Sequence, residues 1–359
     1  MKLLFVVGAR PNFMKVAPIL RAVAERDSNV QQILVHTGQH FDAKMSDVFF
    51  DELGLPTPDE HLGISGGSHA EQTARIMLAF EPILLKHRPN WLVVVGDVNS
   101  TVACSLVATK LRVKIAHVEA GLRSGDMSMP EEVNRRITDA ISDLLLTPSP
   151  DGDANLLTEG VSQEKIICVG NVMIDSLVRA LPTIERQTTL TDLLLNGSEY
   201  VLATLHRPSN VDNAEMLSQL IGAINVIAQT QTVLFPAHPR TRQRLHDAGI
   251  NVDGNVRLMD PLGYFDFMAV MRSAKAVITD SGGVQEETTY LGVPCLTVRP
   301  NTERPITIDQ GTNRLVTPGR EPLLEAWTQL VADPPTKRCP ALWDGRAAHR
   351  IAEALLRNE

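Results

Sequence analysis

The alternation of apolar runs with helical stretches limits the fold of this chain more than any other feature. The runs Leu3–Val7, Ile33–His36 and Trp91–Val95 are almost wholly apolar, and a stretch of helical periodicity such as Met14–Arg26 follows each. Apolar strands that alternate with helices are typical of a parallel sheet covered on both faces. The first half therefore predicts an α/β sheet. Its other strands are expected at Val113–Val118, Leu144–Thr147 and Ile166–Val169.

The second half repeats this pattern with shorter pieces. Its strands are predicted at Tyr200–Thr204, Val233–Ala237, Val256–Met259 and Ala276–Thr279. Polar or glycine-rich segments follow each run, where ligands bind in doubly wound sheets. At 359 residues the chain is too long for one ordinary core. We predict two Rossmann-like, doubly wound domains that face each other across a cleft. They span residues 1–171 and 172–344, and a terminal helix within 345–359 packs back on the first domain.

Composition excludes several classes of protein. The net charge of -8 argues against broad binding of nucleic acid or acidic membranes. No apolar run is long enough to span a bilayer, and Met1-Lys2 opens directly into a strand, so we expect a cytoplasmic protein. Four widely spaced cysteines fit reduced thiols, and no metal site is expected because no His, Cys or Asp cluster has ligand spacing. The cysteines are Cys104, Cys168, Cys295 and Cys339.

The stretch His117–Arg136 is the densest in charge near a predicted strand end. It brings four carboxylates, Glu119, Asp126, Glu131 and Glu132, among Arg123, Arg135 and Arg136. Carboxylates at the carboxyl end of a parallel strand lie at the ligand crevice. Surface Asp and Glu are common, so any single one is more simply explained as solvated. Glu119, next to the strand end, is predicted to belong to a functional site.

The segment Asp280–Glu287, DSGGVQEE, is the best candidate for an anion site. A strand, then Ser281-Gly282-Gly283, then a helix presents backbone N–H groups to a phosphate. Glu287, one turn into the helix, is placed to accept from a ribose diol. The alternative is an ordinary N-cap with a tight turn. Neither the Gly-x-Gly-x-x-Gly fingerprint nor a Walker Lys-Ser/Thr pair occurs, which argues against NAD chemistry and ATP hydrolysis, so no cofactor is expected.

Basic residues and histidines follow several predicted strands. The cations that could bind a diphosphate are Arg10, Lys15, Arg207, Arg240 and Arg304. Arginine can bind phosphate oxygens through two parallel hydrogen bonds, although a surface position would explain any single one equally. His206 and His238 each follow an apolar run directly. One such histidine is usually structural, whereas two from separate strands indicate an imidazole near the ligand.

Taken together, these motifs resemble the non-hydrolysing UDP-N-acetylglucosamine 2-epimerases over essentially the whole chain. The matching segments, in order, are Gly8–Ile19, Val93–Thr101, His117–Asp126, Pro130–Arg136, Gly170–Leu177, Leu205–Asn213, His238–Arg242, Asp280–Glu287 and Thr302–Val316. The resemblance implies a fold of the glycosyltransferase-B type and a UDP-sugar held between the domains. It also implies interconversion of UDP-GlcNAc and UDP-ManNAc for cell-envelope polysaccharide. The family usually forms homodimers, so a homodimer is expected.

The resemblance also implies roles for individual residues. The implied reaction eliminates UDP across C1–C2 to give 2-acetamidoglucal and then re-adds UDP from the other face. Asp97, Glu119 and Glu131 match the acidic catalytic positions and His206 the catalytic histidine. Asp97 or Glu131 would exchange the C2 proton, Glu119 would stabilise charge at C1, and His206 would assist at the diphosphate. The implied binding residues are Arg10, Lys15, Arg207, His238 and Arg304 around the diphosphate, Ser281, Gly282 and Gly283 at its phosphates, Glu287 at the ribose and Phe267 at the uracil.

Departures from the family pattern leave alternatives open. Gln39-His40-Phe41-Asp42 replaces a run linked to a second, activating UDP-GlcNAc, and Asn12 stands where a Glu is frequent. The segment from Thr37 to Phe50 also resembles relatives acting on UDP-2,3-diacetamido uronic acids, whereas the intact Thr302–Ile308 favours plain GlcNAc. A hydrolysing epimerase, a glycosyltransferase of the same fold and a sugar-nucleotide-binding regulator without chemistry are further alternatives.

Overall fold

A computed structural model describes residues 1–38, 55–193, 195 and 197–357 of the chain. It divides the chain into two compact units, each described here by itself. Unit 1 is Met1–Val178 together with Ala341–Glu359, and unit 2 is Arg179–Pro340. The predicted short helix before Gly54 and the departure at Gln39–Asp42 lie outside the described residues.

Unit 1 contains a parallel sheet with the strand order β3-β2-β1-β4-β5-β6-β7. Its strands are β1 (Lys2–Val7), β2 (Gln31–His36), β3 (Glu60–His61), β4 (Trp91–Val95), β5 (Lys114–Val118), β6 (Leu144–Thr147) and β7 (Ile166–Cys168). Every pairing is parallel, as expected for strands joined by helical crossovers. The order reverses between β1 and β4, so the loops after these strands and after β5 lie at the switch point where doubly wound sheets bind ligands.

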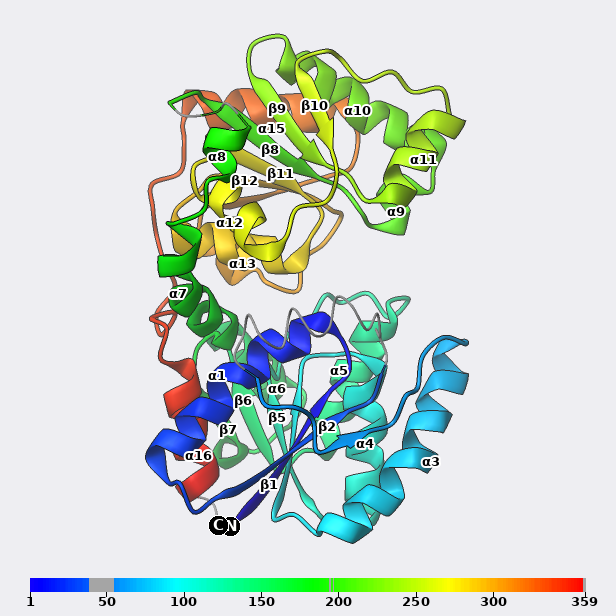
Figure 1. Cartoon of the computed structure of the whole chain (residues 1–359), viewed down its shortest axis with the longest axis vertical. Helices are drawn as coiled ribbons and strands as arrows, with labels where there is room; N and C mark the ends of the chain where they lie inside the picture. The colour runs from blue at the N-terminus through cyan, green and yellow to red at the C-terminus, as the bar shows by residue number, and fades with distance from the viewer. Residues whose placement is uncertain (39–54, 194, 196, 358–359) are drawn as a thin grey trace. The chain divides into compact units, whose positions relative to one another are not determined.

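Helices cover both faces of this sheet (Figure 1). They are α1 (Arg10–Arg26), α3 (His69–His87), α4 (Asn99–Lys110), α5 (Pro130–Ile141), α6 (Pro150–Thr158), the short 3-10 helix Gln163–Lys165 and α16 (Ala347–Arg357). On one face, α3 and α4 pack on Leu4, Val6, Leu92 and Val94. Because strand side chains alternate between faces, the neighbouring strand residues point the other way, where α1 and α16 lie side by side.

The C-terminal helix α16 belongs to unit 1 although the whole of unit 2 precedes it in sequence. It packs on α1, and its first N–H groups are capped by a buried carboxylate. Asp175 of α7 (Val172–Ile184) accepts from the backbone N–H groups of Ala347 and Ala348 at 3.1 and 2.7 Å. These two bonds satisfy free N–H donors at the start of α16 and connect this helix to unit 1.

Unit 2 contains a second parallel sheet, with the order β10-β9-β8-β11-β12-β13. Its strands are β8 (Tyr200–Thr204), β9 (Thr232–Pro236), β10 (Val256–Met259), β11 (Ala276–Thr279), β12 (Cys295–Val298) and β13 (Asn313–Val316). Its helices are α8 (Thr189–Asp192), α9 (Pro208–Val211), α10 (Ala214–Ala228), α11 (Pro239–Asp247), α12 (Tyr264–Arg272), α13 (Gly282–Leu291), α14 (Ile306–Asp309) and α15 (Arg320–Ala332). The predicted class of two parallel α/β domains is confirmed.

Local differences from the sequence predictions have physical causes. Helix α1 begins at Arg10 rather than Met14, because Pro11 suits the first helical turn and Asn12 binds the preceding N–H groups. The short strand β3 lies in a segment that the sequence indicated as loop, because two residues carry no readable period. None of the helices among the described residues combines the length and apolar character that crossing a membrane requires.

Candidate active site

Two of the predicted acids lie at adjacent strand ends in unit 1. Asp97 is in the turn between β4 and α4, and Glu119 directly follows β5, which pairs with β4. The Asp97 carboxylate accepts from Arg135 Nε and Nη2 at 3.0 and 2.7 Å and remains about a quarter exposed. Glu119 is buried and forms an ion pair with Lys15 of α1. Each acid therefore has a buried cation as its partner.

The two acids are also close in space. A methyl group built on Gly96, the residue before Asp97, would lie 3.1 Å from Lys15 Nζ and 3.2 Å from Glu119 Oε2. Gly96 has a φ of 66°, so both its conformation and its neighbours require glycine. Glu119 itself has a φ of 71°, which is uncommon for a residue with a side chain. Backbone strain of this kind is concentrated at functional sites.

The third acid, Glu131, lies in the first turn of α5 and is partly buried. Its neighbour Glu132 is wholly buried and bound to Arg135 at 2.8 Å and to the Ser124 N–H at 2.9 Å. Burial favours the neutral acid, but these hydrogen bonds and the Arg135 charge lower the pKa of Glu132. The Glu131 carboxylate makes no hydrogen bond or ion pair within the described part of the chain. Glu132 therefore builds the site, and Glu131 is available to a ligand.

The turn at Gly8-Ala9 is filled by a side chain. Asn12 Oδ1 accepts from the N–H groups of Gly8 and Ala9 at 3.1 and 3.0 Å, and Asn12 Nδ2 donates to the Val95 carbonyl at 3.0 Å. The amide accepts and donates at once, and thus ties this turn to the end of β4. Arg10 begins α1, and its side chain is outside the described part of the structure.

In unit 2, His206 lies on a buried carboxylate. It follows β8, and its Nδ1 is 2.8 Å from Asp280 Oδ1 at the end of the adjacent strand β11. Asp280 also accepts from the backbone N–H groups of His206 and Arg207 and from Asn210 Nδ2. Burial opposes ionisation of Asp280, but the hydrogen bond and charge of His206 lower its pKa. Nδ1 is therefore the donor, and the half-exposed ring presents Nε2 to a ligand.

The predicted anion turn begins directly after this carboxylate. Ser281 is the N-cap of α13, and Gly282 and Gly283 are its first residues. Arg207 Nε donates to the Asp280 carbonyl at 3.0 Å, which holds the Arg207 guanidinium at this turn. Asp280 therefore connects the histidine, the arginine and the phosphate turn.

The predicted residues of unit 2 lie in a recess beside His206, around α13 and on the surface. His206, His238 and Phe267 line one recess of about 160 Å³, together with Thr204, Leu205, Pro236, Pro261 and Leu262. On α13, Glu287 is buried and accepts from the Tyr264 hydroxyl at 3.2 Å. Arg304 is bound by Glu286 at 2.7 Å and by Glu303, so part of its charge is neutralised within the protein. Arg240 pairs with Asp212 on the surface.

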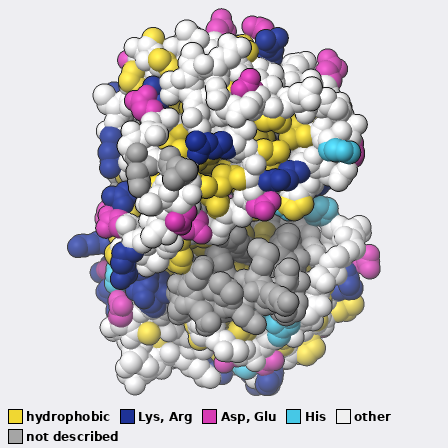
Figure 2. Space-filling view, turned by 45° about the horizontal axis from the view of Figure 1, so that its top comes forward, with side chains coloured by type: hydrophobic (Ala, Val, Ile, Leu, Met, Phe, Trp, Pro, Cys, Tyr) yellow, Lys and Arg dark blue, Asp and Glu magenta, His cyan; other side chains and the backbone are white. Residues whose placement is uncertain are grey.

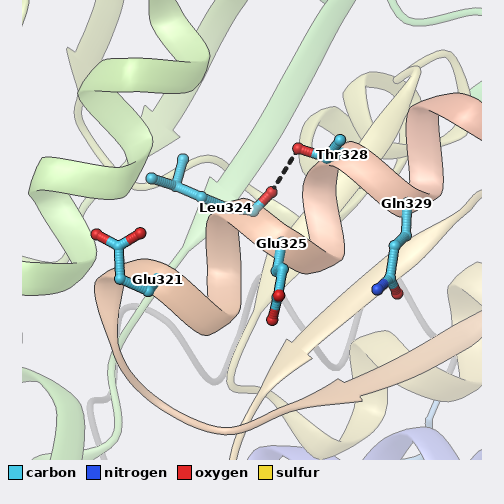
Figure 3. A pocket seen from close by; sticks show the side chains of 5 residues that line it. All are labelled: Glu321, Leu324, Glu325, Thr328 and Gln329. Atoms are coloured by element: carbon cyan, nitrogen blue, oxygen red, sulfur yellow. Dashed lines mark hydrogen bonds between the residues drawn. The ribbon is translucent and has the colours of Figure 1, made fainter.

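The surface of unit 2 includes a second hollow that does not contain these residues. Figure 2 shows Lys and Arg side chains beside hydrophobic ones on the upper body, which is unit 2. The second hollow, of about 360 Å³, lies along α15 (Figure 3). It is lined by Glu321, Leu324, Glu325, Thr328 and Gln329. One helix face with two acids and no cation is unsuited to a diphosphate, so the recess beside His206 is the better nucleotide site.

Sequence reasoning missed the charges beneath the candidate catalytic groups. Arg135, Asp139 and Asp280 are buried and bind those groups or lie close to them, and none of these roles was predicted from the sequence. One usable signal was His117, a polar residue inside the apolar strand β5, because a buried polar side chain needs a partner. Among the described residues, no group of three or more His, Cys, Asp or Glu could hold a metal ion.

Comparison with known proteins identifies the family. Residues 22–356 match the family model for UDP-N-acetylglucosamine 2-epimerase. A "UDP-N-acetylglucosamine 2-epimerase homolog" of Methanococcus maripaludis is 45% identical over 90% of this chain and 91% of its own. The UDP-2,3-diacetamido-2,3-dideoxy-D-glucuronate 2-epimerase of Pseudomonas aeruginosa is 41% identical over 99% of both chains.

Solved structures agree with this assignment. The crystal structure of Methanocaldococcus jannaschii UDP-GlcNAc 2-epimerase in complex with UDP-GlcNAc and UDP superposes with a TM-score of 0.89. It is 38% identical in sequence and covers 99% of this chain and 100% of that one. The resemblance noted in the sequence motifs is therefore confirmed, and the chain belongs to the UDP-N-acetylglucosamine 2-epimerase family of isomerases.

Proposed function

We propose that the enzyme interconverts UDP-GlcNAc and UDP-ManNAc without hydrolysis and so supplies precursors of cell-envelope polysaccharide. UDP leaves across C1–C2 to give 2-acetamidoglucal and returns on the other face. The observation that carries this proposal is the placement of Asp97 and Glu119 at adjacent strand ends, each beside a buried cation. The similarity to a structure that holds UDP-GlcNAc and UDP supports the substrate.

Unit 1 supplies the acids that work on the sugar. The C2 proton has no adjacent carbonyl to acidify it, so removal depends on positive charge developing at C1 as UDP leaves. Asp97 or Glu131 exchanges the C2 proton, and Arg135 positions the Asp97 carboxylate. Glu119 stabilises the charge at C1. Lys15 neutralises Glu119 in the free protein and lies near the diphosphate when substrate binds.

Unit 2 binds UDP. The N–H groups of Ser281, Gly282 and Gly283 at the start of α13 bind phosphate oxygens, because a helix N-terminus favours anions. Arg207, Arg10 and Arg304 add positive charge. Glu287 accepts from the ribose, and Phe267 lies against uracil in the recess that it shares with His206 and His238. His206, held through Nδ1 by Asp280, donates from Nε2 to the departing diphosphate.

A second candidate substrate is UDP-2,3-diacetamido-2,3-dideoxy-D-glucuronate. The relative that bears this name is 41% identical over 99% of both chains, so overall similarity does not separate the two sugars. The intact segment Thr302–Ile308 favours plain GlcNAc. It builds the wall beneath α13, where a methyl group on Gly282 would lie 3.0 Å from both Arg304 Nη1 and Glu303 Oε1.

One experiment separates these reactions. Proton NMR in deuterated water follows UDP-GlcNAc and, in a parallel sample, UDP-2,3-diacetamido-2,3-dideoxy-D-glucuronate. Each is incubated with the enzyme and no acceptor. We expect UDP-ManNAc to form with deuterium at C2 and without free sugar. Free ManNAc with UDP would identify a hydrolysing enzyme. Turnover of only the diacetamido uronate would identify the second substrate, and no turnover of either would contradict the proposal. Turnover without an acceptor excludes a glycosyltransferase.

We also propose a homodimer, in keeping with the family. Sedimentation equilibrium of the full chain tests this, and a mass of 39.3 kDa at all concentrations would contradict it.

A further inference from the structure

His117 is a buried histidine for which the reaction described above has no use. It lies in β5, two residues before Glu119, and is 0% exposed. Its Nδ1 is 2.7 Å from Asp139 Oδ1 of α5, and its Nε2 is 2.9 Å from the Gly96 carbonyl oxygen at the end of β4. The ring thus bridges a helix and the turn that carries Asp97.

Both ring nitrogens face oxygens that can only accept. A carbonyl has no proton to give, so Nε2 must donate to Gly96. Asp139 Oδ2 is occupied by the Arg123 guanidinium at 2.7 Å and by the Gly121 N–H at 3.1 Å. Asp139 is therefore a carboxylate, and Nδ1 must donate as well.

Helix α5 carries one candidate catalytic acid of unit 1 and contacts another through its side chains. It carries Glu131 in its first turn, and Arg135 binds the Asp97 carboxylate. Asn134 Nδ2 donates to the Asp97 carbonyl at 2.8 Å. Farther along the helix, Asp139 holds the Gly96 carbonyl through His117.

Asp139 also reaches the turn that follows Glu119. Its contact with the Gly121 N–H fixes this turn, where a methyl group on Gly121 would lie 2.4 Å from the Gly152 carbonyl oxygen. Neither turn can move without breaking a buried, charge-assisted hydrogen bond. These bonds are stronger than neutral ones, and leaving a partner unpaired in the interior is costly.

We propose that His117 is a positioning residue that carries a proton on both ring nitrogens and fixes, through Gly96, the spacing between the catalytic acids of unit 1. It touches neither substrate nor reacting atoms. The charged groups around the ring come from two elements. Asp139 of α5 faces His117, and Arg123, in the loop after β5, faces the Asp139 carboxylate. The catalytic part of this inference rests on the proposed function, whereas the protonation of His117 does not.

Nitrogen NMR of histidine-labelled full-length enzyme tests the protonation directly. We expect one imidazole with both nitrogens protonated at about pH 7.5, where a histidine of ordinary pKa is mostly neutral. That signal should be absent from His117→Gln. A neutral His117 ring with one bare nitrogen at this pH would overturn the proposal, whatever the enzyme's activity.

Steady-state kinetics test the positioning. Glutamine can donate to Gly96 or to Asp139 but cannot bridge them as a cation, so His117→Gln should lower kcat roughly ten- to one-hundred-fold. The KM should stay within about two-fold, because unit 2 binds the nucleotide. Asp139→Asn should give the same pattern. Ile76→Ala, a matched loss of buried bulk in α3 of the same unit, should lower the thermal midpoint yet keep kcat within about two-fold.

The two outcomes that contradict positioning are distinct. If His117→Gln keeps the wild-type kcat, His117 acts only on stability. The same conclusion holds if Ile76→Ala, with the same thermal midpoint as His117→Gln, loses as much kcat. If wild-type enzyme turns over neither sugar nucleotide, the proposed function fails, and the NMR result still decides whether His117 is doubly protonated.

Discussion

The two units present their catalytic groups with opposite arrangements of charge. In unit 1, carboxylates lie at the strand ends, and buried cations, Arg135 and Lys15, pair with them. In unit 2 an imidazole lies at the strand end, and a buried carboxylate, Asp280, holds it by Nδ1. The same parallel fold thus prepares acceptors of protons in one unit and a donor in the other. The buried partner, rather than the fold, decides which.

Neutralising the acids of unit 1 should have the largest effect. Asp97→Asn, Glu119→Gln and Glu131→Gln each keep the shape but remove the charge that the reaction uses. We expect each to lower kcat by about 10³-fold or more, with UDP affinity nearly unchanged. Stopped assays with UDP-GlcNAc and calorimetry with UDP measure the two effects. Glu164→Gln, on the 3-10 helix of the same unit, is the control and should keep full activity.

In unit 2, removing the buried carboxylate should resemble removing the histidine. His206→Gln should lower kcat by about 10²- to 10³-fold, and Asp280→Asn by about 10²-fold, because an amide no longer selects the Nδ1–H form of the ring. The same kinetic assay measures both. Asp212→Asn breaks only surface ion pairs, with Arg240 and Arg244, and should be neutral. If the Asp280→Asn enzyme had the wild-type kcat, the buried carboxylate of unit 2 would not hold its catalytic group as the buried cations of unit 1 do.

The units also differ in how much of them could be predicted from sequence. Strands β4, β6, β8, β10 and β11 were predicted with the bounds that the structure gives, because their apolar runs are bordered by glycine or polar residues. Strand β13 was not predicted, because Asn313–Val316 is half polar. Periodicity thus finds apolar strands and misses short strands that contain polar residues, such as β3 and β13.

For the site, the sequence predicted the residues at the strand ends but not the buried residues that pair with them. Glu119 was predicted because it follows an apolar run, whereas its pairing with Lys15 joins residues 104 positions apart. The strained φ of Glu119 and the occupation of the Gly8-Ala9 turn by Asn12 are also three-dimensional facts. Long-range pairing of this kind leaves no local pattern in the sequence.

The Lys15–Glu119 pair should show strong thermodynamic coupling. Both side chains are buried, so Lys15→Met removes the cation that pairs with a buried carboxylate and should destabilise unit 1 by about 3 kcal/mol. The double variant Lys15→Met/Glu119→Gln removes both charges and should recover more than half of that loss. Urea unfolding of the four proteins gives the coupling energy. Additive effects would mean that the pair is not formed in the folded protein, and the surface pair Arg75–Glu71 offers a weaker reference.

Acid should weaken both units for the same reason. The pKa values of Asp139 in unit 1 and Asp280 in unit 2 lie below the ordinary value in the folded protein. Their stabilisation is present above the pKa of an unfolded aspartate, about 4, and is lost as pH falls through the folded values. Thermal midpoints should fall below about pH 4, and Asp280→Asn should flatten this fall. An unchanged slope would show that other carboxylates dominate it.

The smallest effects should come from the two glycines that begin α13, and they should differ in sign. A methyl group on Gly282 would press on Arg304 and Glu303, which buried ion pairs hold in place, so Gly282→Ala should destabilise unit 2 by about 1 kcal/mol. No atom lies within 4 Å of a methyl group on Gly283, so Gly283→Ala should stabilise the helix by about 0.5 kcal/mol. If the phosphates of UDP contact the Gly283 N–H as proposed, this more stable variant should still bind UDP more weakly, which calorimetry measures. A gain in stability with unchanged affinity would place the diphosphate elsewhere than this turn, while a loss of affinity confined to Gly282→Ala would assign it to the wall formed by Arg304.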